Sequence, residues 1–316
     1  EPLLQGWILD FLLVELLLQI FMANLEENME LSETQLVNVD RMEFLQSQIL
    51  FFIGALPVII SGLWALLFYR PFQKYQSFFW AFFFTLLVFM YFRAKDYYAI
   101  GLYPIYIAFG AVFLADFLKA GWKQYLNPVV IAIPIVLFIP MYQIAFPNKS
   151  PEWIVNHSDT YKEYGLLRWE DGKDHSIPQD YADMLGWKEL ARKVDAIYIS
   201  LPNPSQTLVL CDNYGQAGAI NYYTRKHIKA VSFNADYVNW FDLEPQYVNL
   251  IRIKNYKEKD DELIETSPYF DKAVVADSIT NPYAREFRTL IFAFTGAQVD
   301  VNERIKDEIR EAKNDR

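Results

Sequence analysis

Long apolar runs separated by short polar stretches dominate the first half of the chain. They lie roughly at Ile49–Tyr69, Phe78–Phe92, Tyr97–Leu118 and Leu126–Phe146. At about 1.5 Å of rise per helical residue, about 20 residues cross a bilayer core of roughly 30 Å. The pattern therefore predicts four transmembrane helices over residues 49–146, the second of them short for a span that stands upright.

The stretch before these runs, residues 1–48, mixes apolar and acidic positions. Residues 7–25 are largely apolar but contain Asp10 and Glu15. A carboxylate at the bilayer centre costs about 2.5–3.5 kcal/mol, so an interfacial or protein-covered helix suits this segment better than a span. Residues 26–48 place apolar side chains at nearly helical spacing among acids. That spacing predicts an amphipathic connector outside the membrane.

The second half of the chain, residues 147–316, alternates short apolar runs with amphipathic stretches. Strands are expected at Thr207–Cys211 and from Ala230, Tyr247, Lys272 and Thr289, and helices at Asp183–Ser200, Tyr214–His227, Tyr256–Glu265 and Asn302–Lys313. Strands that alternate with helices indicate an α/β domain with a largely parallel sheet. The expected fold is therefore an α-helical multi-span membrane region followed by an α/β domain.

Charge divides the chain in the same way as the apolar pattern. The formal net charge of -10 is the sum of about -8 over residues 1–48, +4 over residues 49–146 and -6 over residues 147–316. No block is basic enough to indicate nucleic-acid binding, which needs a positive surface. The short loops after the first and third apolar runs carry the basic residues Arg70, Lys74, Lys119 and Lys123.

Basic residues in short loops remain in the cytoplasm, which fixes an expected orientation. The α/β domain of residues 147–316 and the loop before the third apolar run then share the outer face. The protein is expected in the cell membrane as a multi-pass protein, with its C-terminal domain extracytoplasmic, on the periplasmic side. Membrane lipids are accordingly expected partners.

Charged and aromatic residues gather at the start of the third apolar run, at Arg93, Lys95, Asp96, Tyr97 and Tyr98. Two interpretations are open for this cluster. Lys and Arg commonly anchor a helix at the membrane interface, with their charged ends in water. The same cations can instead donate hydrogen bonds to the phosphate of an anionic lipid head group.

A second candidate site follows the predicted strand Thr207–Cys211, where Asp212, Asn213 and Gly215 precede a helix. Open α/β sheets bind ligands at the carboxyl ends of their strands, and a helix N-terminus favours anions. The GQAG spacing differs from the dinucleotide motif GxGxxG. A turn that serves only the fold is the simpler explanation.

Other residue types indicate little catalytic or metal-binding chemistry. Cys211 is the single cysteine, so it allows no internal disulfide and is expected to pack as a small buried hydrophobe. The three histidines are too scattered to suggest zinc, and the acids of residues 170–180 lack the calcium-loop pattern.

Three stretches are long and have distinctive sequences: RAKDYYAIGLYPIYIAFGAVFLADF at residues 93–117, EDGKDHSIPQDYADMLGW at residues 170–187, and DNYGQAGAINYY at residues 212–223. They resemble bacterial family 39 membrane glycosyltransferases, which are dolichyl-phosphate-mannose-protein mannosyltransferase-like enzymes related to the aminoarabinose lipid A transferases. The family's N-terminal half, with its catalytic acidic residue, has no counterpart here. The resemblance thus implies the C-terminal part of an enzyme of the GT-C architecture.

The resemblance implies sugar transfer from a polyprenyl-phosphate-linked donor to an unknown acceptor on the outer face. Arg93 and Lys95 would bind the lipid phosphate, Tyr97 and Tyr98 would orient the head group, and Asp96 would position the cations. The catalytic residue is unknown, and a divalent cation remains an open question. The alternative is a non-enzymatic, membrane-anchored α/β module that binds an envelope ligand or partner.

Overall fold

The computed structural model describes residues 40–314, which fall into two compact units. The first unit runs to Ser150 and includes Arg168–Asp174, and the second comprises Pro151–Leu167 and His175–Arg316. The predicted interfacial helix and most of the amphipathic connector lie outside the described residues. Each unit is described by itself below.

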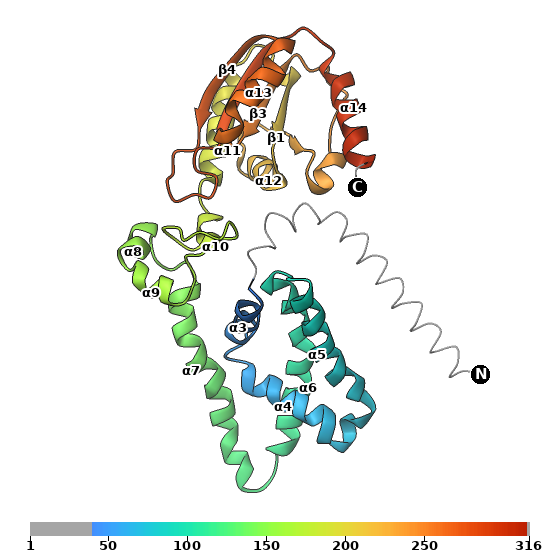
Figure 1. Cartoon of the computed structure of the whole chain (residues 1–316), viewed down its shortest axis with the longest axis vertical. Coiled ribbons are helices and arrows are strands. Elements are labelled where there is room, and N and C mark those ends of the chain that lie inside the picture. Colours follow the sequence, from blue (N-terminus) through green and yellow to red (C-terminus); the bar gives the residue numbers. More distant parts are fainter. Residues whose placement is uncertain (1–39, 315–316) are drawn as a thin grey trace, which may run out of the picture. The chain divides into compact units, whose positions relative to one another are not determined.

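Up to Ala145, the first unit is built of helices joined by short links (Figure 1). Its α-helices are α3 (Arg41–Phe51), α4 (Leu56–Phe68), α5 (Gln76–Tyr91), α6 (Tyr103–Phe117) and α7 (Asn127–Ala145), and its 3-10 helices are η2 (Arg70–Tyr75), η3 (Asp96–Leu102) and η4 (Gly121–Leu126). Because η3 leads into α6 and η4 into α7, these two pairs form the longest apolar helices of the unit.

Two helices among the described residues are long and apolar enough to cross a membrane, namely Asp96–Phe117 and Gly121–Pro140. A third is available if α3 and α4, which meet at a bend of 102°, count as one span. The prediction of four spans therefore exceeds what residues 40–314 provide. Helix α5, with 16 residues, is about 24 Å long, shorter than a bilayer core of roughly 30 Å.

The bend between α3 and α4 corrects the prediction of one continuous helix over residues 49–69. The chain turns at Phe52–Ala55, where Ala55 N–H donates to the Phe52 carbonyl at 2.8 Å. Pro57 stands at the start of α4, a position that tolerates proline because the first N–H groups of a helix have no partner within it. The glycine and proline at positions 54 and 57 therefore favour two helices over one.

Helices α4 and α6 cross at two glycines. A Cβ atom on Gly62 would lie 2.3 Å from the Tyr106 carbonyl oxygen, and one on Gly110 would lie 1.9 Å from the Val58 carbonyl oxygen. Only glycine allows backbones to approach this closely, as in the small-residue contacts of membrane helices. The crossing places aromatic side chains of neighbouring helices in one core, with Tyr106 donating to the Phe78 carbonyl at 2.8 Å.

The basic loops of the first unit lie at one common end. The Tyr69 hydroxyl, just after α4, donates to Asp116 near the end of α6 at 2.5 Å, and Asp116 also pairs with Lys119. This contact brings the loop that carries Arg70 and Lys74 beside the loop that carries Lys119. The shared end agrees with the charge distribution expected from the sequence.

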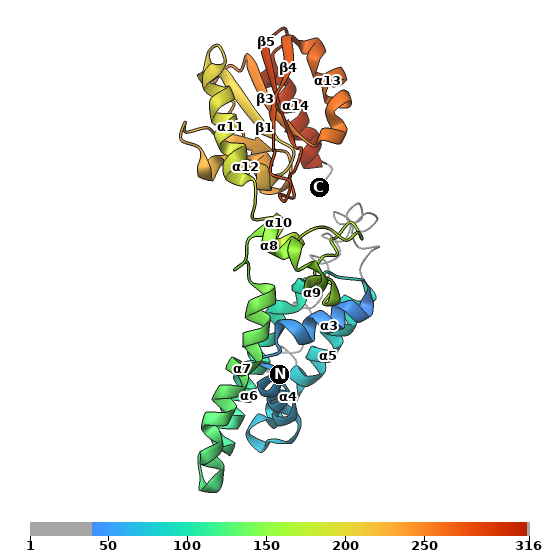
Figure 2. The same ribbon diagram turned by 90° about the vertical axis from the view of Figure 1, so that its left-hand side faces the viewer.

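The second unit has an α/β fold (Figure 2). It begins with short helices α8 (Pro151–Asn156), α9 (Ser158–Glu163) and α10 (Gln179–Ala182). Its sheet is formed by β1 (Thr207–Cys211), β2 (Ala230–Ser232), β3 (Asn249–Lys254), β4 (Phe270–Ser278) and β5 (Leu290–Ala297). The longer helices are α11 (Trp187–Ser200), α12 (Tyr214–Tyr223), α13 (Lys259–Thr266) and α14 (Val301–Asn314). All the strands expected from the sequence are confirmed.

The strand order is β2-β1-β3-β5-β4, and the sheet is mixed. Strands β1, β2 and β3 pair in parallel, whereas β5 pairs antiparallel with both β3 and β4. The prediction of a largely parallel sheet is thus correct for β2, β1 and β3 and wrong for β5 and β4, which pair antiparallel. The cause lies in the link between β4 and β5, which contains no helix; antiparallel neighbours can be joined by such a link, whereas parallel ones usually need a helical crossover.

Alternate residues of the strands build two separate cores. Val209 and Ile251 belong to the cluster that packs against α11 and α12, whereas Leu208 and Leu250 belong to the cluster that includes residues of α14. This alternation follows from the period of two along a strand. Burial on both faces explains why β1 reads as an uninterrupted apolar run.

Candidate functional site

The end of α5 positions the first cation of the candidate site. Arg93 has φ of 52°, in the left-handed region. The Ala94 N–H donates to the Phe89 carbonyl at 2.9 Å and the Arg93 N–H to the Met90 carbonyl at 3.3 Å, which is the Schellman pattern of a helix C-terminus. Glycine usually takes this position, because a Cβ atom there costs about 1–2 kcal/mol. The exposed Arg93 is therefore held here at a cost to the backbone.

Lys95, the second cation, pairs with a carboxylate that the sequence interpretation did not place here. Its Nζ lies 2.6 Å from Oε1 of Glu170, and the two side chains are 15% and 30% exposed. Glu170 lies on a tight hairpin closed by the bridge between Arg168 and Asp174, which belongs to the first unit. A half-buried ammonium needs a carboxylate or equivalent acceptors, but a partner 75 residues away leaves no local signal in the sequence.

Asp96 follows the two cations in sequence, but its hydrogen bonds in this structure hold the backbone at the start of η3. Its carboxylate accepts from the Tyr97 N–H at 2.8 Å, at the start of η3. Its carbonyl accepts from the buried Gln48 side chain at 2.9 Å, which ties α3 to this loop. Tyr97 and Tyr98 are exposed and meet edge to face, with ring centroids 4.9 Å apart. The Lys95 ammonium lies 6.0 Å from the Tyr97 ring centroid.

We refer to Arg93, Lys95, Asp96, Tyr97, Tyr98 and Glu170 as the polar cluster. It combines two cations, two carboxylates and two exposed phenol rings at the start of a helix able to span a membrane. The cations and hydroxyls are donors suited to an anionic oxygen-rich group such as a phosphate. The exposed ring faces also offer a surface on which a sugar ring can lie.

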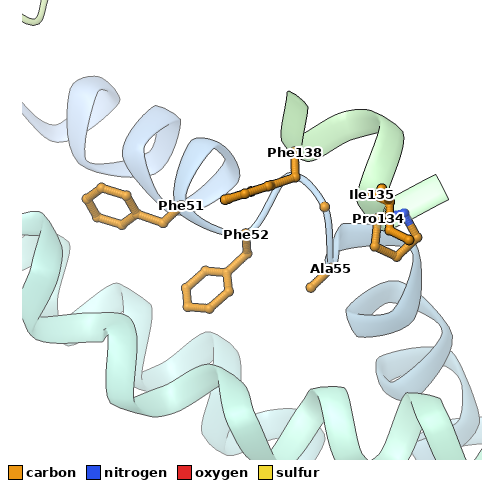
Figure 3. A pocket seen from close by; sticks show the side chains of 7 residues that line it. Phe51, Phe52, Ala55, Pro134, Ile135 and Phe138 are labelled. Carbon is orange, nitrogen blue, oxygen red and sulfur yellow. The ribbon is translucent and has the colours of Figure 1, made fainter. Parts of the chain in front are cut away.

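An apolar groove lies at the bend between α3 and α4 (Figure 3). It has a volume of about 380 Å³ and is lined by Phe51, Phe52, Gly54, Ala55, Pro134, Ile135 and Phe138. Phe52 also stacks on Tyr103, the first residue of α6, at 4.0 Å between ring centroids. Gln48, which donates to the Asp96 carbonyl, and Phe51, which lines the groove, both belong to α3, so this helix contacts both the polar cluster and the groove.

A second groove, of about 300 Å³, continues the apolar surface of α7. It is lined by Val58 of α4, by Leu118 after α6 and by Asn127, Val130 and Ile131 of α7, among others. The α7 residues that line the two grooves recur at intervals of three and four, so they occupy one face of the helix.

The turn after β1, the other site expected from the sequence, is engaged in internal contacts. The Asn213 side chain caps α12 by accepting from the Gln216 N–H at 3.0 Å. Asp212 lies 3.0 Å from Lys254 Nζ and 3.7 Å from a nitrogen of Arg252. A Cβ atom on Gly215 would meet the Asn213 side chain at 3.1 Å, so the turn is compact. These contacts fit a turn that stabilises the fold.

Lys254 and Gln216, which lie beside this turn, also have hydrogen-bond partners within the fold. Burial acts to lower the pKa of Lys254, but the hydrogen bonds that its ammonium donates to Glu258 and Asp212 outweigh burial and raise the pKa above its ordinary value. The Gln216 amide donates to Glu286 at 2.7 Å and accepts from the Asp212 N–H at 3.0 Å. Lys254 therefore remains a cation that holds the ends of β1 and β3 together.

Cys211, at the end of β1, is 1% exposed, which confirms its expected packing. Burial raises the pKa of its thiol, so it stays protonated and unreactive. Across residues 40–314, no three His, Cys, Asp or Glu side chains come close enough to hold a metal ion.

Comparisons with family models, with curated proteins and with solved structures found no match to this chain. The candidate site therefore stands on its own geometry.

Proposed function

We propose that this chain is the C-terminal part of a membrane glycosyltransferase that moves a sugar from a polyprenyl-phosphate donor to an acceptor on the outer face of the membrane. The observation that carries the proposal is the polar cluster at the start of the Asp96–Phe117 helix, joined through α3 to an apolar groove. A polyprenyl-phosphate sugar has an anionic head and a long apolar tail, and it needs both surfaces.

The head of the donor binds at the polar cluster. Arg93 and Lys95 donate to the phosphate and stabilise the charge that grows on it as the sugar leaves. Glu170 orients the Lys95 ammonium, because its carboxylate lies 2.6 Å from Nζ. Tyr97 and Tyr98 lie against the sugar and offer hydroxyls to it.

The tail of the donor lies in the apolar groove at the bend between α3 and α4. Phe52, Pro134 and Phe138 offer a surface without charges, which suits an isoprenoid chain. The second groove extends this surface along α7 toward Asn127. The two grooves share one face of α7, as an extended chain requires.

The orientation belongs to the same proposal. The basic loops that contain Lys74 and Lys119 lie in the cytoplasm, and the polar cluster and the α/β unit lie outside. A reporter fused after Phe146 then behaves as extracytoplasmic and one fused after Lys74 as cytoplasmic. The reverse pattern would place the polar cluster on the wrong side for the proposed donor.

A non-enzymatic, membrane-anchored module has one observation in its favour. The ion pair between Lys95 and Glu170 is also what an interfacial anchor would use to hold a loop. Under this alternative the α/β unit binds an envelope ligand, and the polar cluster only fixes the helices in the bilayer.

Transfer assays separate the two functions. Membranes that contain the full-length protein are given polyprenyl-phosphate sugars, and sugar release from the lipid is followed with and without membrane proteins and glycans as acceptors. The glycosyltransferase consumes the donor, and membranes without the protein do not. Donor that survives with every sugar tested, in membranes where the protein is inserted and folded, contradicts the proposal.

A further inference from the structure

One face of α11 in the second unit carries cations together with an exposed apolar side chain. Lys188, Arg192 and Ile199 are separated by four and seven residues, so they lie along a single stripe of this helix. The two cations are exposed to solvent, and Ile199 is 55% exposed. This stripe is therefore not the part of α11 that packs into the core.

The end of α12 lies along the same stripe. The Lys188 ammonium lies 5.5 Å from the ring centroid of Tyr223, which is the last residue of α12. Seven residues further along α11, the Asp195 carboxylate accepts from the Arg225 N–H at 2.8 Å. These two contacts hold the end of α12 and the residues after it against α11, with Arg192 between the two points of contact.

Exposed cations therefore gather where α11 meets the end of α12. They are Lys188, Arg192, Arg225 and Lys226, and none of the ion pairs found within residues 40–314 includes them. Asp195 also lies here, but it is only 9% exposed and its carboxylate accepts from the backbone. The surface of this region is thus positive, although residues 147–316 together carry a charge of about -6.

Apolar side chains project among these cations. Ile199 continues the stripe on α11, and Tyr222, whose ring meets that of Tyr223 at 4.8 Å between centroids, is 79% exposed. Cations around exposed apolar and aromatic side chains are typical of surfaces that lie at a lipid interface. The apolar side chains enter the head-group region there, and the cations meet phosphates. We call Lys188, Arg192, Ile199, Tyr222, Arg225 and Lys226 the basic face.

We propose that the basic face docks the second unit on an anionic lipid surface. Residues 146–150 link the unit to α7, which belongs to a helix long and apolar enough to span a membrane. This short tether keeps lipid head groups at a high effective concentration around the unit. Each Lys or Arg near an anionic bilayer strengthens docking about fivefold. A soluble polyanion would engage the cations but would give Ile199 and Tyr222 no role.

A dye on the basic face tests the docking. Cys211 is buried and its thiol is unreactive, so a cysteine introduced by Ser200→Cys, next to Ile199, is labelled selectively. The labelled full chain is placed in nanodiscs of phosphatidylcholine, or of an equimolar mixture of phosphatidylcholine and phosphatidylglycerol, and quenching of the dye by nitroxide-bearing lipids is measured. Quenching is expected to be strong in the anionic discs, weak in the neutral discs, and reduced by high salt.

A second label position controls for general proximity to the disc. Ile264 on α13 is 72% exposed, and its neighbour Leu263 packs into the core on the face of the sheet opposite to α11 and α12. Ile264→Cys carries the same dye and is expected to remain unquenched in both kinds of disc.

Charge variants then separate the basic face from net charge. Arg192→Gln combined with Arg225→Gln removes two exposed cations, and the ratio of docked to undocked unit is expected to fall roughly 30-fold. Lys257→Gln combined with Lys259→Gln is the matched control, because it removes the same charge from exposed positions around the start of α13. This control is expected to dock like the protein without it. Circular dichroism checks that both variants fold.

This inference does not depend on the transfer reaction, because docking is measured without any donor. Equal quenching in neutral and anionic discs would overturn it, as would a loss in the control pair as large as that in the arginine pair. A dye that responds to soluble polyphosphate but not to phosphatidylglycerol would assign the basic face to a soluble polyanion instead. Quenching that accompanies a doubled oligomeric mass would assign it to a second copy of the chain.

Discussion

The polar cluster in the first unit and the turn after β1 in the second unit both combine cations with carboxylates, but they use them differently. At the turn, Asp212 joins Lys254 and Arg252, and the Asn213 side chain caps α12. In the polar cluster, a cation occupies a left-handed position that glycine would take at lower cost, and two tyrosines beside it are exposed. Charges that complete a fold stabilise it, whereas charges held in a costly position next to exposed rings point to a ligand.

Removing the cation next to Glu170 tests the role assigned to the polar cluster. Lys95→Ala in the full-length protein is expected to lower transfer by roughly 30- to 1000-fold, which corresponds to about 2–4 kcal/mol of lost phosphate stabilisation. Lys95→Arg is expected to restore only part of the rate, since a planar fork does not replace a point charge. The rate of donor consumption in membranes is the measurement.

Lys119→Ala is the matched control for this experiment. Lys119 also pairs with a carboxylate, Asp116, but follows the opposite end of α6. Its variant is expected to keep transfer within about twofold, a difference of less than roughly 0.5 kcal/mol. Equal losses in the two variants would mean that Lys95 acts only as a helix anchor.

In the second unit, the ion pairs around Glu189 show what charges do when they only stabilise the fold. Glu189 on α11 accepts from Lys193 and Thr280, and Lys193 also pairs with Asp277 of β4. Burial acts to raise the pKa of Glu189, but these hydrogen bonds dominate and lower it from 4.5 to about 2. The folded state therefore favours the charged carboxylate.

The sign of this shift gives a pH dependence of stability. The contribution of Glu189 is complete above pH 4.5 and is lost as the pH falls toward 2, because the unfolded state then binds the proton more readily. It amounts to at most about 3 kcal/mol. Glu189→Gln is expected to destabilise the unit at pH 7 and to flatten the decline below pH 4.5 in thermal unfolding. Parallel wild-type and variant curves would contradict the assigned ion pairs.

The turn after β1 should respond in stability and not in transfer. Asp212→Ala is expected to cost about 1–2 kcal/mol, less than a fully buried pair, because the Asp212 side chain is 30% exposed. Denaturant unfolding of the second unit is the measurement. A large loss of transfer in an Asp212→Ala protein that unfolds like wild type would show that this turn binds a ligand.

Arg93→Gly separates the backbone cost of this position from the role of its charge, and it is the variant with the smallest expected change in stability. Glycine relieves the left-handed position at the end of α5, so stability should hold or rise by up to about 1 kcal/mol. Transfer should nevertheless fall, because the guanidinium is gone. If transfer persists while thermal stability rises, Arg93 has no role in binding the donor.

The sequence predicted the second unit better than the first. Buried strands such as Thr207–Cys211 stand out because their apolar runs are short and bounded by turn residues. The antiparallel insertion of β5 was missed because strand direction depends on what links the strands, here the helix-free stretch between β4 and β5. The local sequence pattern therefore predicts helices and strands more reliably than it predicts which strands pair.

In the candidate site, the local part was predictable and the distant part was not. Arg93 to Tyr98 are neighbours in sequence, so their clustering needed no fold. Glu170 and the groove residues Phe52 and Pro134 come from segments far apart in the chain, brought together by packing. The bend at Gly54 creates the groove, and the interruption of an apolar run by glycine and proline was its only signal in the sequence.

Binding of a short-chain polyprenyl phosphate to the full-length protein in nanodiscs tests the central claim most directly. The measurement compares this lipid with the polyprenol of the same chain length, in wild type and in Lys95→Ala. The polar cluster predicts that wild type binds the phosphate at least about tenfold more tightly than the alcohol, a preference of about 1.4 kcal/mol, and that Lys95→Ala loses most of that preference. Equal affinity for the phosphate and the alcohol in wild type would contradict it.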